Sequence, residues 1–173
     1  IKCSSYLWRF VLWVAFKALI NKHKLLLLHF EYNNMEIDLI STIEPILKKA
    51  GDKIMEVYNS EKSNLVDYKA DNSPLTLADI ASNGEIVEGL SRHFNYPIIS
   101  EELENASYQD RKDFKKFWCV DPLDGTKEFI NRNGEFTVNI ALITNDLPVF
   151  GGIYVPDKDI YYFGVEGEGA FKK

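Results

Sequence analysis

The apolar residues of the chain change their spacing about halfway along it, and this change limits the possible folds. Between residues 36 and 94 they recur every three or four positions, which is the period of an amphipathic helix. From residue 97 onward they form short β-branched and aromatic runs separated by turn residues, as strands do. Helices followed by sequential strands predict an α+β layered domain, with two helices packed on a largely antiparallel sheet.

The two helices are predicted at residues 36–59 and 78–94. Pro45 interrupts the first pattern, so it either kinks this helix or lies in the first turn of its main segment. Thr76 precedes the second pattern at a position suited to an N-cap.

The strands are predicted from short apolar runs bounded by polar turns. The first run ends at Ser100, and the second ends at Asp121. Short turns join the later runs, which indicates an antiparallel meander. The predicted strands cover residues 97–100, 117–120, 136–143, 149–155 and 160–165.

Charge is unevenly distributed along the sequence. The formal net charge is −6, with about +4 in residues 1–34 and about −10 in residues 35–173. An acidic body argues against general nucleic-acid binding, which needs a basic surface. It permits an anionic substrate that is held through metal ions, because bound cations invert the local field.

Residues 1–34 differ from the rest of the chain. Their longest apolar run, residues 6–20, contains Arg9 and Lys17 and is too short to span a bilayer. Three interpretations stay open: sequence read in frame upstream of a start at Met35, a peripheral membrane anchor, or a helix packed on the body. The expected location is the cytoplasm, with a peripheral contact on the inner face of the cell membrane under the second interpretation.

Acidic residues follow two of the predicted strands. Asp121 and Asp124 enter a turn made by proline and glycine, which can direct both carboxylates and the carbonyl between them to one point. Glu101 and Glu102 follow the other strand, and the two groups converge if the strands are neighbours. Oxygen ligands of this kind suit Mg²⁺, and without a cation such carboxylates would repel one another.

Each of these acidic residues also has an interpretation that involves neither metal binding nor catalysis. The two aspartates can simply cap the backbone of their turn, and the two glutamates can begin a solvated loop. Asp79 fits the N3 position of a capping box with Thr76. Asp71 fits an exposed loop.

Together these segments resemble the inositol-monophosphatase-like family of Mg²⁺-dependent, lithium-sensitive phosphatases. Residues 121–126, Asp-Pro-Leu-Asp-Gly-Thr, match the family's DP(I/L)DGT signature, residues 69–79 match its K-x-D-x-S-P-x-T-x-A-D element, and residues 100–102 match its S/G-E-E. Residues 124–130 and 133–143 look like the 3'(2'),5'-bisphosphate nucleotidases in particular. Inositol monophosphatases usually carry Thr-Asn-Phe where residues 127–129 are Lys-Glu-Phe.

The resemblance implies a metal site of two or three Mg²⁺ ions. Its implied ligands are Glu101, Asp121, the Leu123 carbonyl and Asp124. Glu102 would lie beside the metals, outside their direct ligands. Asp71 belongs to the upstream element and is expected to organise its loop rather than take part in catalysis.

The resemblance also implies a catalytic pair and a phosphate contact. Asp79 and Thr126 would activate the attacking water, and backbone N–H groups of Gly125 and Thr126 would lie near the phosphate. Glu101 and Asp121 would contact the substrate as well.

The implied reaction converts adenosine 3',5'-bisphosphate and water to AMP and phosphate, so the expected partner is a small phosphorylated nucleotide. An alternative within the family is a phosphatase for inositol monophosphate or a sugar bisphosphate. An alternative of another class is a non-catalytic module that binds metal or nucleotide, or that is tethered to a membrane by residues 1–34. The oligomeric state stays open.

The family's layout includes a second α/β half with a W-D-x-A-A motif, whose aspartate completes the metal site. No such motif occurs in this sequence. Residues 35–173 are therefore expected to form the first half of a phosphatase domain, cut after a strand, with little activity alone.

Overall fold

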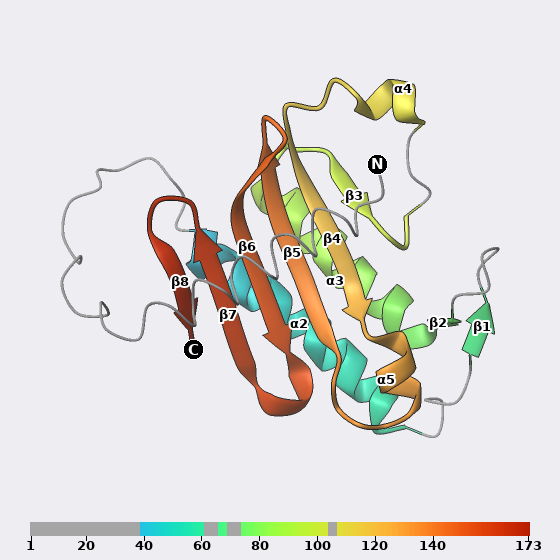
Figure 1. Cartoon of the computed structure of the whole chain (residues 1–173). Coiled ribbons are helices and arrows are strands. Elements are labelled where there is room, and N and C mark those ends of the chain that lie inside the picture. The colour runs from blue at the N-terminus through green and yellow to red at the C-terminus, as the bar shows by residue number, and fades with distance from the viewer. Residues whose placement is uncertain (1–38, 61–65, 69–73, 104–106) are drawn as a thin grey trace.

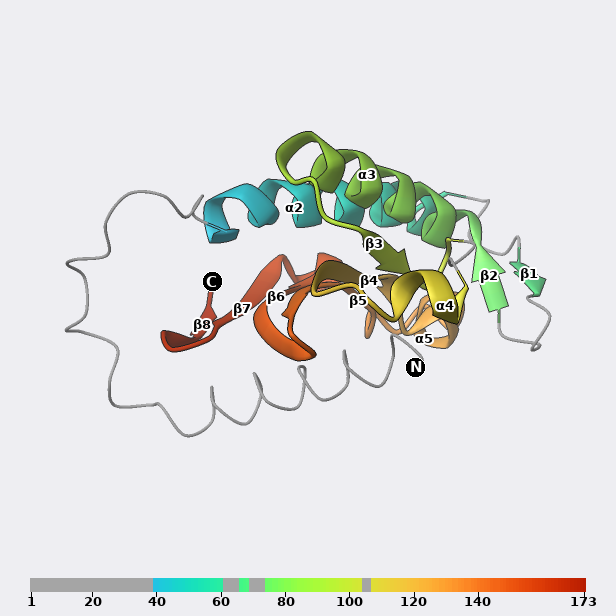
Figure 2. The ribbon, with the colours of Figure 1, turned by 90° about the horizontal axis from the view of Figure 1, so that it is seen from above.

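Two long helices lie side by side on one face of a six-stranded sheet (Figure 1; Figure 2). The computed structural model describes residues 39–60, 66–68, 74–103 and 107–173. The helices are α2 (Leu39–Tyr58) and α3 (Leu77–His93), close to the predicted bounds. This arrangement confirms the predicted α+β layering.

The sheet has the order β3-β4-β5-β6-β7-β8. Its strands are β3 (Ile98–Ser100), β4 (Lys116–Asp124), β5 (Thr137–Thr144), β6 (Leu147–Val155), β7 (Ile160–Val165) and β8 (Gly169–Lys172). The strands β5 to β7 form the predicted antiparallel meander, which β4 and β8 extend, whereas β3 pairs with β4 in parallel. The strand β8 was not predicted, because its short, glycine-containing sequence has no alternating pattern.

Shorter elements connect or flank these layers. They are the two-stranded ladder of β1 (Val66–Tyr68) and β2 (Pro74–Thr76), the helices α4 (Tyr108–Arg111) and α5 (Thr126–Ile130), and the 3-10 turn η2 (Pro156–Lys158). The short helix α5 begins directly after β4, so the acidic signature runs from a strand into a helix (Figure 1).

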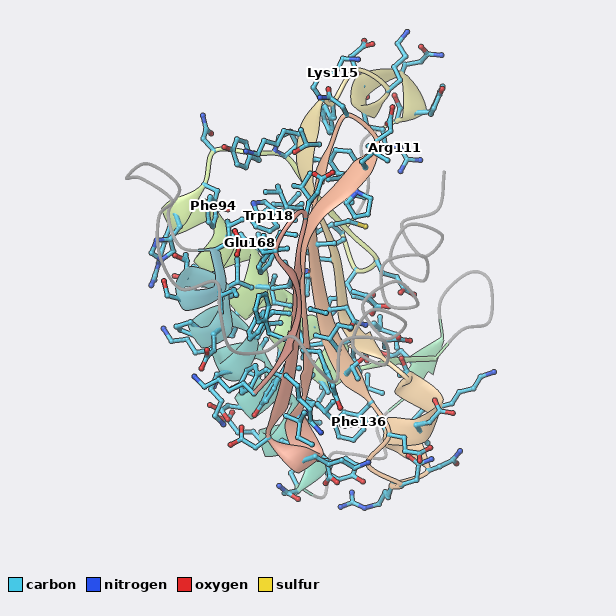
Figure 3. All side chains as sticks on the ribbon, turned by 60° about the vertical axis from the view of Figure 1, so that its left-hand side comes forward. Phe94, Arg111, Lys115, Trp118, Phe136 and Glu168 are labelled. Carbon is cyan, nitrogen blue, oxygen red and sulfur yellow. The ribbon has the colours of Figure 1, made fainter. Side chains whose placement is uncertain are left out.

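The helix α2 is fixed to the sheet by one apolar face. Ile43, Leu47, Ala50 and Ile54 recur every three or four residues and are fully buried. Pro45 lies in the second turn, because the helix begins at Leu39, so the first-turn alternative for this proline is wrong. At the far end of the core, the rings of Phe94 and Trp118 lie 5.0 Å apart between the helical layer and β4 (Figure 3).

The sheet carries apolar side chains on both faces. Trp118 and Val120 of β4 belong to the core under the helices. The intervening Cys119 lies with Ala141 and Ile143 in a separate buried cluster, because successive side chains of a strand point to opposite faces. Residues 1–34 lie outside the described residues, so their predicted interpretations stay untested. Among the described helices, none combines the length and apolar composition needed to span a bilayer.

Gly51 is expected to tolerate no side chain, although it lies inside α2. A Cβ atom there would be 2.3 Å from Cε1 of Tyr154, whose hydroxyl donates to Asp159 at 2.8 Å. The ring therefore cannot move away without losing a hydrogen bond. We expect Gly51→Ala to lower the free energy of unfolding by about 1–3 kcal/mol in urea titrations, despite the better helix propensity of alanine.

Gly84 of α3 provides the matched control for this substitution. It is exposed, and no atom lies within 4 Å of a Cβ built there. Gly84→Ala is expected to raise the free energy of unfolding by about 0.5–1 kcal/mol, as for an ordinary helical position. Equal effects of the two substitutions would contradict the close packing of Gly51 on Tyr154.

Candidate active site

The strand β4 carries the acidic signature further than predicted. The prediction that this strand ends at Asp121 is wrong, because it continues to Asp124. Asp121 pairs with Asn139 and Asp124 pairs with Thr137, so three steps along β4 match two along β5. This is a β-bulge, and the proline inside it has no N–H group to contribute to the ladder. The bulge is therefore the local reason why two aspartates three residues apart can act on one region.

The strand β3 brings the second acidic group to the same end of the sheet. Ser100 pairs in parallel with Val120, and the N–H group of Glu101 donates to the Val120 carbonyl at 3.2 Å. Glu101 therefore follows its strand directly beside Asp121. The expected convergence of the two strand ends is confirmed.

The carboxylates of this region repel one another. Burial raises the pKa of Asp121 well above its ordinary value, and the charges of Asp124, Glu101 and Asp79 add to that shift. Burial also raises the pKa of Asp124, with an opposing hydrogen bond from Asn139. Four acidic side chains from three elements thus share one electrostatic environment.

Asp79 caps α3 and also contacts Thr126. Its Oδ2 accepts from the N–H group of Thr76 at 2.7 Å and from the Thr76 hydroxyl at 2.5 Å, which confirms the capping box. Its Oδ1 accepts from the hydroxyl of Thr126 at 3.4 Å. Asp79 is 1% exposed, so the cap holds this carboxylate against Thr126 in a buried position.

The turn between β4 and α5 depends on a glycine. Gly125 has φ of 93°, and a Cβ atom there would be 2.8 Å from the carbonyl oxygen of Glu135. Thr126 is the first residue of α5, and its hydroxyl has one proton to donate. Two acceptors lie within reach of that hydroxyl: Asp79 Oδ1, and the carbonyl oxygen of Leu123 at 3.3 Å. The Leu123 carbonyl therefore points toward the contact between Asp79 and Thr126.

Aromatic packing anchors this turn to the core. Phe129 of α5 and Phe136 are fully buried, with ring centroids 5.4 Å apart. Both rings also pack on Tyr58 at the end of α2. The first residues of α5 are thus held in place by the hydrophobic core.

Three polar residues of the region were not predicted. Ser82 and Asn83 lie on the buried face of α3, and Asn139 lies in the buried strand β5. The Nδ2 of Asn139 donates to Asp124 at 3.3 Å. Each residue is polar at a position where the period of its element predicts an apolar one, and that mismatch is the signal that could have identified it.

The donor atoms fit a hard divalent cation, but they are not yet arranged around one. The carboxylate and carbonyl oxygens match the ligand preference of Mg²⁺. Within the described residues, however, no three His, Cys, Asp or Glu side chains are placed so that they could hold an ion. Glu101 is exposed and Glu102 is half-buried. The predicted ligand set therefore stays a prediction, and Asp71 lies outside the described residues.

The model of the family described as "Inositol monophosphatase family" matches residues 37–173. The chain belongs to this family. Curated relatives include the 3'(2'),5'-bisphosphate nucleotidase CysQ of Escherichia coli (strain K12), at 45% identity over 131 residues. That alignment covers 75% of this chain and 53% of the relative. The protein of the same name from Buchnera aphidicola is 46% identical, over 75% of this chain and 49% of the relative.

Solved structures of the inositol monophosphatase family share the fold. CysQ from Bacteroides thetaiotaomicron superimposes with a TM-score of 0.66 at 50% identity, covering 79% of this chain and 48% of that chain. The suhB protein from Bartonella henselae gives a TM-score of 0.69 at 29% identity, covering 78% and 52%. The chain thus spans about half the length of the family members that it matches.

Proposed function

We propose that this inositol monophosphatase family member is a Mg²⁺-dependent phosphomonoester hydrolase of the 3'(2'),5'-bisphosphate nucleotidase type. Its substrate would be adenosine 3',5'-bisphosphate and its products AMP and phosphate. The observation that carries the proposal is the pairing of β3 with β4, which places Glu101 at the same strand end as Asp121, while Asp79 contacts the Thr126 hydroxyl after that strand. The 3'(2'),5'-bisphosphate nucleotidase activity for which the CysQ relatives are named supports this choice of substrate.

The acidic residues of the two strand ends would hold the metal ions. In this proposal Glu101, Asp121, Asp124 and the Leu123 carbonyl are ligands, and Glu102 lies beside them. Bound Mg²⁺ would lower the pKa of a water and neutralise charge on the leaving oxygen. The mutual repulsion of the carboxylates is consistent with a site that is completed by cations.

Asp79 and Thr126 would orient and deprotonate the attacking water. When the Thr126 hydroxyl donates to Asp79 Oδ1, its lone pairs stay available to accept from that water. The capping bonds from Thr76 fix the second oxygen of Asp79, so the carboxylate cannot rotate away. Backbone N–H groups of Gly125 and Thr126 would contact the phosphate, together with Glu101 and Asp121 through the metal ions.

The deciding assay compares two substrates with the full-length natural polypeptide, including any residues beyond this chain. Phosphate release from adenosine 3',5'-bisphosphate is expected to exceed release from inositol 1-phosphate. Lys127 and Glu128, where inositol monophosphatases usually carry Thr-Asn, support this order. Faster turnover of the inositol substrate would instead assign the protein to the inositol or sugar phosphatases of the family.

Thr126→Val is expected to lower kcat by roughly 10²–10⁴-fold, because valine keeps the volume but removes the hydroxyl. Thr144→Val, in the same polypeptide, is the matched control at the opposite end of the sheet. Steady-state phosphate release at saturating substrate measures both. A Thr126→Val enzyme within threefold of the parent would contradict the assigned role of the hydroxyl.

A second candidate is a module that binds metal or nucleotide without turnover. It is favoured by the finding that, among the described residues, no three acidic side chains are yet placed to hold an ion. Binding of adenosine 3',5'-bisphosphate without phosphate release by the full-length polypeptide would support it.

A further inference from the structure

Two consecutive residues of α3 contact the two strand ends that carry the acidic site. We infer that Ser82 and Asn83 are positioning residues, which set the placement of the β4 bulge relative to the turn of Glu101 and Glu102. The inference rests on the proposed function, because it concerns the same site. Neither residue is assigned a role by the motifs that identify the family.

Ser82 fixes the bulge. It is fully buried, and its hydroxyl donates to the carbonyl oxygen of Pro122 at 2.8 Å. The bulge interrupts the ladder between β4 and β5 at this residue, so the Pro122 carbonyl lies where strand pairing is broken. Leaving a buried carbonyl without a hydrogen-bond donor costs free energy. The Ser82 hydroxyl therefore stabilises the bulge in this conformation.

Asn83 fixes the other strand end through a serine. Its Oδ1 accepts from the hydroxyl of Ser100 at 2.7 Å, and Ser100 Oγ in turn accepts from the N–H group of Glu102 at 3.3 Å. Ser100 is fully buried and Asn83 is 8% exposed. The turn that carries the two glutamates is thereby tied to α3.

The helix holds both contacts in a fixed relation to the catalytic pair. Asp79, Ser82 and Asn83 are three and four positions apart, so they lie on one face of α3 within about one turn, or roughly 5 Å. Asp79 contacts Thr126 from this same face. One rigid helix therefore aligns three segments: the bulge of β4, the turn after β3 and the start of α5.

This alignment matters because like charges would otherwise separate the segments. Asp121 and Asp124 lie on the bulge, Glu101 lies on the turn, and Asp79 lies on the helix. The two neutral anchors hold the segments together without adding charge to the site. Removing either anchor should let one segment relax away and weaken cation binding more than it weakens the fold.

The test uses Ser82→Ala and Asn83→Ala in the full-length natural polypeptide. Ser91→Ala is the matched control, since Ser91 is an exposed serine of the same helix. MgCl₂ is titrated alone while Tm is recorded, and phosphate release is measured separately for KM and kcat. The Mg²⁺ concentration for half of the maximal rise in Tm should increase about tenfold in each variant, consistent with the loss of one buried hydrogen bond. Ser91→Ala should stay within twofold of the parent.

The outcomes separate positioning from a purely structural role. A lower Tm without Mg²⁺, combined with an unchanged Mg²⁺ midpoint, would overturn the inference, as would a parent protein whose Tm does not respond to Mg²⁺. A parent that responds to Mg²⁺ but releases no phosphate would contradict the proposed function alone, and the midpoints would still decide the inference. If Ser82→Ala fails to fold, the Mg²⁺ midpoints of Asn83→Ala and Ser82→Cys decide the inference. The cysteine is similar in shape to serine, but its thiol is a weaker hydrogen-bond donor.

Discussion

Asp121→Asn is expected to reduce phosphate release from adenosine 3',5'-bisphosphate on the order of a thousandfold, because a lost metal ligand removes several kcal/mol of transition-state stabilisation. The substitution keeps the volume of the side chain and removes its charge. Steady-state assays of the full-length polypeptide at several Mg²⁺ concentrations measure the effect. Asp113→Asn, at an exposed position before β4, is the control and should leave turnover unchanged.

The same substitution should stabilise the metal-free protein. Folding raises the pKa of Asp121, so this group favours the folded state at low pH, and that contribution is lost as the pH rises through the raised pKa. An uncharged asparagine removes this penalty at neutral pH. We expect a gain of about 0.5–2 kcal/mol without Mg²⁺ and a much smaller rise in Tm when Mg²⁺ is added.

Unchanged turnover in a folded Asp121→Asn protein would contradict the assignment of Asp121 as a metal ligand. A fall in stability without metal would have a different meaning. It would show that the charge of Asp121 is favourably paired in the folded protein, which contradicts the repulsion described above.

The 173-residue chain by itself is expected to turn over adenosine 3',5'-bisphosphate at less than about 1% of the rate of the CysQ relative from Escherichia coli (strain K12). The physical reason is that, among the described residues, no three His, Cys, Asp or Glu side chains are placed so that they could hold an ion. Glu101 is exposed, so water competes with it for any cation. Phosphate release by both proteins under identical Mg²⁺ concentrations measures the ratio.

Circular dichroism of the same sample provides the control, since an inactive chain must be shown to be folded. Turnover within tenfold of the relative would show that the described carboxylates complete the site on their own. The prediction and the Asp121→Asn experiment are independent, because the first concerns the chain alone and the second concerns the full-length polypeptide.

The helices and most strands could be predicted from the sequence because each is set by a local pattern. The α2 stripe of Ile43, Leu47 and Ile54 repeats at helical spacing, and Thr76 caps α3 as expected. The bulge was not predictable in this way. Pro122 is a typical turn residue, so the sequence indicated a turn there. A strand can nevertheless continue past a proline when its hydrogen-bond ladder is interrupted at that residue, as in β4.

The acidic residues of the site were predicted from their motifs, but the residues that hold them were not. Ser82 contacts a carbonyl 40 positions away, and no local pattern specifies such a partner. Asp79 was weighed as either a cap or a catalytic residue, and the structure confirms the cap and adds a contact with Thr126. Each of its two oxygens has its own partner, so the cap and the contact with Thr126 coexist.

The contact between Asp79 and Thr126 has a consequence for folding order. The strands β4 to β8 pair with their sequence neighbours, whereas Asp79 meets Thr126 across 47 positions. Long loop closures are slower than hairpins, so we expect the meander to form early and the joining of α3 to β4 and α5 to come late. Partly folded chains would then contain a sheet but no site, with amides of β5 and β6 protected from hydrogen exchange before those of α3.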